Sequence, residues 1–336
     1  MTWATLGSLA LPFTLQKSGV QSRLDLNRLS TELTTGRVES PARHLRGDIG
    51  MLHAIENRLS RITGFDTALK QTVTAFDTAQ SALDLVAQAG KSLGEKLVIT
   101  SQSTAGADAR TVAASAARSV LDEIVSALSV TVAGRAVFSG TVTDRTPLAS
   151  REALIAALAP EVAGMTNAAD VTAALQAWFM DPGTGFADAV YRGGPAAVGG
   201  LIDDAQPGPA LPTAEDPAIR RQMMAAAMVV LVDDGALNLN DTQARTVMQT
   251  AMTTLLGNAA DVAALQARVG VAQEVLDQRQ LRLSLERDRL EQLRSDKIGA
   301  DPYTTATALE RARVQLESIY TLTSRLSRLT LTEYLR

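Results

Sequence analysis

The sequence predicts a mainly α-helical protein: a long antiparallel helical bundle, or coiled coil, formed by both chain ends, with a small mixed α+β insert in the middle. Three observations predict this fold class. Apolar residues recur at steps of three and four along both ends of the chain. Glycine and proline gather in the middle. Aromatic residues make up only 4% of the 336 residues, so the core must consist mainly of Ala, Leu, Val and Ile, which suits closely packed helices.

The first predicted helix lies near the N-terminus. Leu26, Leu29 and Leu33 fall on one helical face, within a helix expected over residues 23–33. Gly36 is expected to end this helix as a C-cap, because glycine adopts the left-handed conformation that closes many helices. The Ser-Pro pair at 40–41 then restarts the chain.

A second run of apolar residues, over 49–97, keeps steps of mostly three and four and predicts one long helix. After a corner at 106–108, a further helix is expected over 109–132. Residues 134–141 (GRAVFSGT) are bounded by glycine and partly favour β structure, so they predict a strand or hairpin arm.

The middle of the chain predicts short elements and loops. Helices are expected over 151–158 and 168–180, and a strand over 187–191. The glycine pair that follows this strand indicates a turn, and residues 206–212 read as an exposed loop.

Helical patterning returns at Asp216-Pro217, where aspartate can cap and proline can take the first helical position. A break is expected over 233–239, and then a helix from Asn240 or Asp241 to about Leu256. The strongest pattern of the sequence follows, a heptad seam in which Arg279 and Glu286 are the polar exceptions. Its residues are Val262, Leu265, Val269, Ala272, Leu276, Arg279, Leu283, Glu286, Leu290 and Leu293.

The last predicted helix starts at Asp301-Pro302. Its inner face carries Leu309, Ala312, Leu316, Ile319, Thr323 and Leu326. An isolated amphipathic helix must bury its apolar face, so we expect the N- and C-terminal helices to pack on each other. This predicts a terminal coiled-coil domain (1–42 with 299–336), a helical rod (43–146 with 213–298) and an outward-facing insert (147–212). A long intramolecular hairpin and an intermolecular coiled coil would both produce the heptad pattern.

The composition argues against most chemistry. The chain has no cysteine, and its two histidines, His44 and His53, have no partner at metal-ligand spacing. The carboxylate pairs at 203–204 and 233–234 lie in turns and read as solvated helix ends. The glycine pairs at 193–194 and 199–200 lack the lysine and Ser/Thr of a phosphate loop. We therefore expect no enzyme activity, no cofactor and no metal.

The sequence also predicts neither nucleic-acid nor membrane binding. The net charge of −4 provides no basic footprint. The longest strongly apolar run, 223–232, is too short to cross a bilayer; its methionines, with Met248 and Met252, are expected in a helical core. Residues 1–15 lack the positive start of a secretory signal, so any export is expected to proceed without a cleaved signal peptide.

Both ends of the chain resemble the flagellin and hook-associated protein family, the axial subunits of the bacterial flagellum. Residues 29–38 (LSTELTTGRV) are similar to a family helix that closes on a Ser/Thr-Gly-Lys/Arg turn. Residues 134–141 resemble the family's Gly-x-Tyr-x-Phe-Ser-Gly-Thr segment, with Ala136 replacing the aromatic residue. Residues 191–194 (YRGG) resemble its Tyr-x-Gly-Asp turn, with Gly194 in place of aspartate.

The C-terminal end continues this resemblance. Residues 298–302 (IGADP), followed by LERA at 309–312, match the family plan. The closing segment, 326–335, with Tyr334 near its end, looks most like the ending of the third hook-associated proteins, the hook–filament junction subunits. One departure concerns the family's double aspartate after the first helix, because residues 40–48 (SPARHLRGD) keep only Asp48.

The resemblance implies a structural, extracellular junction protein between hook and filament, exported unfolded through the flagellar apparatus. Implied partners are other copies in a ring, a neighbouring hook-associated protein and flagellin, and a cytoplasmic export chaperone that holds the C-terminal helix. Terminal helices would fold on assembly and pair Leu26, Leu29 and Leu33 with the inner face of the last helix. A flagellin filament subunit and a cytosolic helical scaffold or adaptor are the alternatives.

Overall fold

The computed structural model describes residues 4–100, 107–203 and 207–334, and the side chains of these except 4–12, 100, 107 and 326–334. The chain forms two compact units. One contains the residues up to Ile62 and from Ser284 onward, and the other contains Thr63–Leu283. Helices α3 (Gly50–Thr100) and α9 (Asp241–Ile298) contribute to both.

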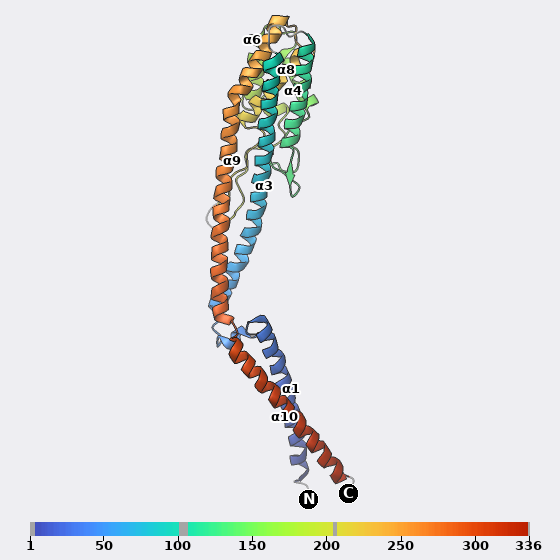
Figure 1. The fold of residues 1–336 in the computed structure, drawn as a ribbon, viewed down its shortest axis with the longest axis vertical. Helices are drawn as coiled ribbons and strands as arrows, with labels where there is room; N and C mark the ends of the chain where they lie inside the picture. The colour runs from blue at the N-terminus through green and yellow to red at the C-terminus, as the bar shows by residue number, and fades with distance from the viewer. Residues whose placement is uncertain (1–3, 101–106, 204–206, 335–336) are drawn as a thin grey trace. The chain divides into compact units, whose positions relative to one another are not determined.

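The terminal unit is built on a hairpin of two antiparallel helices, α1 (Ala4–Thr35) and α10 (Pro302–Tyr334), drawn in blue and red in Figure 1. The predicted C-cap at Gly36 is confirmed: its φ is 67°, and its N–H donates to the Glu32 carbonyl at 2.9 Å. An antiparallel bridge between Arg37 and Gly299 then joins the two ends of the chain. The packing of head on tail therefore forms within a single copy.

The chain restarts as the sequence predicts. Ser40 occupies the N-cap of the short helix α2 (Pro41–His44), and Pro41 takes its first position. The long helix predicted over 49–97 is confirmed as α3, a continuous helix of 51 residues. The first helix extends well beyond its predicted start at residue 23, because the apolar residues before it continue α1 back to Ala4.

The larger unit is a helical bundle in which α3 and α9 run antiparallel (Figure 1). Gln273 donates to Asp77 at 2.7 Å, and Gln266 donates to Asp84 at 2.6 Å, which fixes the register of the two helices. Helices α4 (Ala107–Leu128) and α8 (Pro217–Asp233) pack against each other in the same unit. Helix α8 is buried on nearly every face, and this explains its methionines: Met223, Met224 and Met228 are core residues, as predicted, together with Met248.

The predicted hairpin arm is present but shorter and shifted. Helix α4 ends at Leu128, so the expectation of a helix to residue 132 is wrong. Strand β1 (Thr131–Val132) instead pairs antiparallel with β2 (Arg135–Ala136). The two-residue turn between them holds Ala133 at φ 51° and Gly134 at φ 75°, the left-handed pair that tight hairpins require.

The segment between this hairpin and α8 contains α5 (Arg151–Val162), α6 (Ala168–Met180) and α7 (Phe186–Ala189). Ser150 and Asn167 cap the first two helices through side-chain oxygens, at 3.3 Å and 3.2 Å from the nitrogens that donate to them. The expected strand over 187–191 is wrong, because most of it forms the short helix α7. The insert boundaries at 147 and 212 stay a prediction.

Helix α9 also differs from its prediction. It is one helix of 58 residues, whereas the sequence suggested a stop near Leu256 and a fresh start. Gly257 and Asn258 look like breakers, yet the Asn258 side chain is buried and donates to the Ala218 carbonyl of α8 at 2.7 Å. A tertiary hydrogen bond thus occupies the polar group that would otherwise compete with the helix.

Candidate functional site

Most of the residues predicted to line the inner face of the terminal hairpin are buried or half-buried there. Leu29 and Ile319 are buried. Half-buried residues surround them: Leu26, Leu309 and Leu316. Leu33, by contrast, is 39% exposed in the single chain. Among the side chains described in α1 and α10, Leu29 and Ile319 are the only buried hydrophobic ones, so the hairpin has a thin core.

Two contacts fix the register of this hairpin. The Nε of Arg23 donates to the Tyr320 hydroxyl at 2.7 Å, and the guanidinium lies 5.4 Å from the centre of the tyrosine ring. Gly19 lies beside Ile319, because a Cβ at this position would be in ordinary van der Waals contact with the Ile319 side chain, at 3.6 Å. The hairpin therefore combines a narrow apolar seam with a polar cross-link.

The opposite face of α1 carries a second apolar stripe, which the sequence analysis missed. Phe13, Val20 and Leu24 are separated by seven and four residues, so they share one helical face. Their exposed fractions are 69%, 53% and 58%, so no described residue covers them. We call Phe13, Val20 and Leu24 the outer stripe. The steps of seven and four along the sequence are the signal that indicates this stripe.

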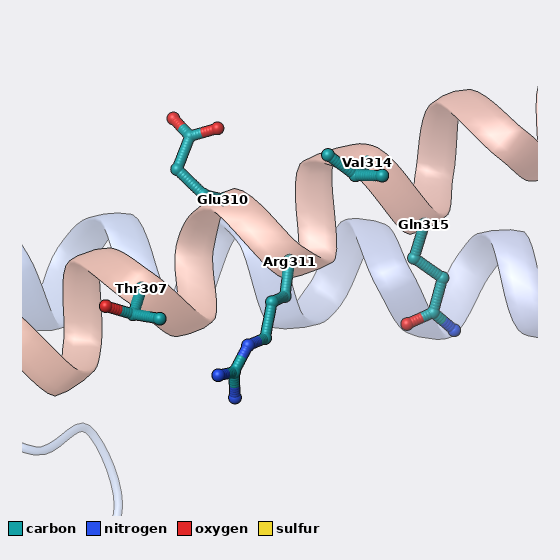
Figure 2. Close-up of a pocket in the computed structure, with 5 residues that line it drawn as sticks. All are labelled: Thr307, Glu310, Arg311, Val314 and Gln315. Atoms are coloured by element: carbon teal, nitrogen blue, oxygen red, sulfur yellow. The ribbon is translucent and has the colours of Figure 1, made fainter.

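Helix α10 also presents apolar groups outward. Tyr303 is 82% exposed and Val314 is 59% exposed. Val314 lies in a shallow groove with four polar neighbours. Figure 2 shows these side chains projecting from α10 while α1 passes behind; they are Thr307, Glu310, Arg311, Val314 and Gln315. The groove lies on one helix and carries no cluster of catalytic groups.

The heptad residues of α9 lie mostly in the core. Leu265, Val269, Leu276 and Leu283 are buried, and Leu290 is half-buried. The two polar exceptions in the seam are paired. Arg279 forms an ion pair with Asp203. Glu286 accepts two hydrogen bonds from Arg58, at 2.6 Å and 3.0 Å. The structure does not describe the side chains of the remaining two predicted residues, Leu326 and Tyr334.

The two family-like segments of the middle region meet. The N–H of Thr141 donates to the Pro195 carbonyl at 3.0 Å, and that of Gly194 donates to the Ser139 carbonyl at 2.9 Å. Gly140 has φ 59°, and a Cβ there would collide with the carbonyl oxygens of Gly194 and Pro195. Backbone hydrogen bonds thus join the segment at 134–141 to the region of 191–194, and this close contact requires glycine at position 140.

Tyr191 adds a side-chain hydrogen bond to this contact. Its hydroxyl donates to the Gly194 carbonyl at 2.7 Å. Burial, with a smaller contribution from the Glu215 charge, raises the pKa of Tyr191 to about 12, so the phenol remains a neutral donor. The hydroxyl thus has a structural role.

The other candidate groups named from the sequence lie apart or in ion pairs. Within the described residues, no group of three or more metal-ligating side chains comes together. His53 lies 3.6 Å from Glu56 on the exposed face of α3. Asp233 pairs with Arg118 at 3.0 Å at the end of α8. No helix in the described part of the chain has both the length and the apolar character needed to span a membrane.

Comparison with known proteins adds one finding. No protein-family model matches the sequence, and a search of curated proteins finds no match. The fold is similar to the solved structure of a provisionally assigned flagellar hook-associated protein from Vibrio parahaemolyticus. The identity is 14% and the TM-score 0.52, over 73% of this chain and 95% of that one. At this identity the likeness establishes a shared fold and no more.

Proposed function

We propose that this chain is a non-enzymatic structural subunit of the bacterial flagellum, and that it joins hook to filament. The observation that carries the proposal is the outer stripe, Phe13, Val20 and Leu24, on a hairpin whose own core is thin. Burying exposed apolar side chains of this size stabilises by about 1.5–3 kcal/mol each, which neighbouring copies would supply on assembly. The shared fold with a hook-associated protein supports the same role.

The proposed assembly follows from the two faces of the hairpin. The inner face holds α1 against α10 within one copy, and the outer stripe packs on an adjacent copy. Such a contact is heterologous, because the stripe of one copy meets a different surface of the next, and heterologous contacts repeat around a ring or helix. Copies in a ring, flanked by a hook-associated protein and flagellin, are the partners in this proposal. An export chaperone would cover the C-terminal helix beforehand, and the assembled position is outside the cell.

Gene deletion followed by electron microscopy tests the junction role. We expect cells with complete hooks, no filaments and flagellin released into the medium. A flagellin would instead form long homopolymers when purified, and a cytosolic scaffold would leave filaments intact. Normal filaments in the deletion strain would end the proposal.

Complementation of that strain tests the outer stripe. The double variant Phe13→Ser/Leu24→Ser should fail to restore filaments, because it removes the apolar contact while leaving the inner seam intact. The matched control is Val198→Ser/Leu201→Ser, which removes two side chains of the larger unit that are 77% and 68% exposed. The control should restore filaments. Equal filament numbers in both variants would show that the outer stripe has no role in assembly.

A further inference from the structure

A small hollow lies where α1 ends and the chain turns into α2. It encloses about 220 Å³ and is lined by Arg28, Glu32, Val38, Ser40, Arg43 and His44. All six residues belong to the terminal unit, and the hollow is separate from the outer stripe. Five of the six lining residues have polar or charged side chains, so a charged ligand is the natural occupant.

The carboxylate in this wall is already satisfied. Glu32 is buried, accepts from the N–H of Glu39 at 3.0 Å and accepts from the Nη1 of Arg28 at 3.2 Å. Arg28 also reaches Asp25 at 3.4 Å. Its Nε, however, is buried and has no hydrogen-bond partner. A buried donor without an acceptor is unfavourable, so the two carboxylate partners do not fully satisfy this guanidinium.

The rim of the hollow offers more donors. Arg43 and His44 are exposed and, within the described residues, have no ion-pair partner. Ser40 makes no capping hydrogen bond to α2, so its hydroxyl is not used by the helix. When the Glu32 charge is counted against that of Arg28, the lining carries one net positive charge, which belongs to Arg43.

We propose that this hollow binds a carboxylate from an acidic side chain of a protein partner. An arginine fork matches a carboxylate in charge and in planar geometry, and charge-assisted bonds of this kind are the strong ones. One excess positive charge balances one carboxylate. A phosphate, with about −1.5 to −2 charges at neutral pH, would exceed that balance and lie close to Glu32. The assignment depends only on the lining residues and does not rest on the proposed assembly.

The two histidines of the chain provide the test. His44 lines the hollow, whereas His53 lies on α3 and outside it, so it serves as an internal reference. Imidazole NMR signals of the unassembled full-length protein are followed during titration with acetate, acetamide or inorganic phosphate, at constant pH and ionic strength. We expect a saturable shift of the His44 signal with acetate, no shift with acetamide, and a His53 signal that does not move.

Two variants identify the site. Arg43→Gln should weaken acetate binding at least about tenfold, because a charge-assisted bond is lost. Arg46→Gln, in the same segment but outside the lining, should bind acetate as the unaltered protein does. Equal shifts of both histidines, or an unchanged response in Arg43→Gln, would overturn the proposal. Phosphate binding at least about tenfold tighter than acetate would overturn the carboxylate assignment. Failed filament assembly would not affect either result.

Discussion

At the scale of single residues, the core of the larger unit depends on a polar side chain where an apolar one would be expected. Gln222 of α8 is buried and donates to the Val86 carbonyl of α3 at 2.7 Å. It can reach that carbonyl because Gly90 has no side chain, and a Cβ there would overlap the Gln222 amide. Asn258 of α9 lies 3.4 Å from the same amide. One glutamine therefore links three helices.

Gly90→Ala is expected to destabilise the protein by about 1–3 kcal/mol, since it displaces Gln222 and leaves buried polar groups unpaired. Gly94, one turn further along α3, has open space around its Cβ position. Gly94→Ala should therefore stabilise α3 by about 0.5–1 kcal/mol, the usual gain for alanine within a helix. Urea unfolding measures both changes. Equal effects from the two substitutions would show that Gln222 does not need the space at Gly90.

At the scale of elements, the start of α10 depends on a charged cap. Asp301 accepts from the N–H of Thr304 at 2.6 Å. The backbone N–H of Thr304, and next its hydroxyl, lower the pKa of the Asp301 carboxyl below its ordinary value of 3.8. Because the folded-state pKa is depressed, the cap stabilises α10 fully above that ordinary value. Its contribution is lost as the pH falls through the folded-state pKa.

Protection of the Thr304 amide against hydrogen exchange should accordingly decline between about pH 5 and pH 2. Asp301→Asn keeps an acceptor at the cap but carries no charge, so its protection should not decline over this range. Protection factors, corrected for intrinsic exchange at each pH, measure the difference. A similar decline in the asparagine variant would assign the pH dependence to another group.

The helices themselves could largely be predicted from the sequence. Periodicity predicted α3 and α10, and cap residues predicted the starts of α8 and α10, because these signals are local. Two features of the fold could not be predicted from such local signals. The β1–β2 turn depends on Ala133 adopting a positive φ, which the residue type disfavours. The continuity of α9 depends on Asn258 reaching α8, a contact between residues 40 positions apart.

The candidate site was predictable only on its inner face. Leu29 and Ile319 could be found because each belongs to a heptad-like run. The hollow beside α2 could not be found, because it requires Arg28 and Arg43 to face one space across the turn at Gly36. Sequence spacing indicates helical faces well, but it does not indicate how the chain folds back between them.

At the scale of the whole molecule, burial differs sharply between the two units. Helix α8 contributes a nearly continuous series of buried residues to the larger unit. The described part of the terminal hairpin holds one buried hydrophobic residue on each helix, Leu29 and Ile319. Because apolar burial is the main favourable term in folding, the hairpin should open far more often than the larger unit.

Hydrogen exchange of the dilute full-length protein, followed by mass spectrometry, should show this difference. We expect α1 and α10 to exchange at least about a hundredfold faster than α8, with protection rising when copies assemble. Equal protection of α1 and α8 in a dilute sample would show that the hairpin is stable alone. That result would remove the energetic reason for assembly.

The bridge between Arg37 and Gly299 also affects how the protein is made. Translation releases α1 long before its partner helix α10. The ribosome reaches Gly299 about 260 residues after Gly36, which at roughly 5–20 residues per second is a delay of about 13–50 s. Throughout this interval the newly made α1 has no intramolecular partner. The order of synthesis therefore leaves a period in which other cellular factors have access to α1 before α10 can cover it.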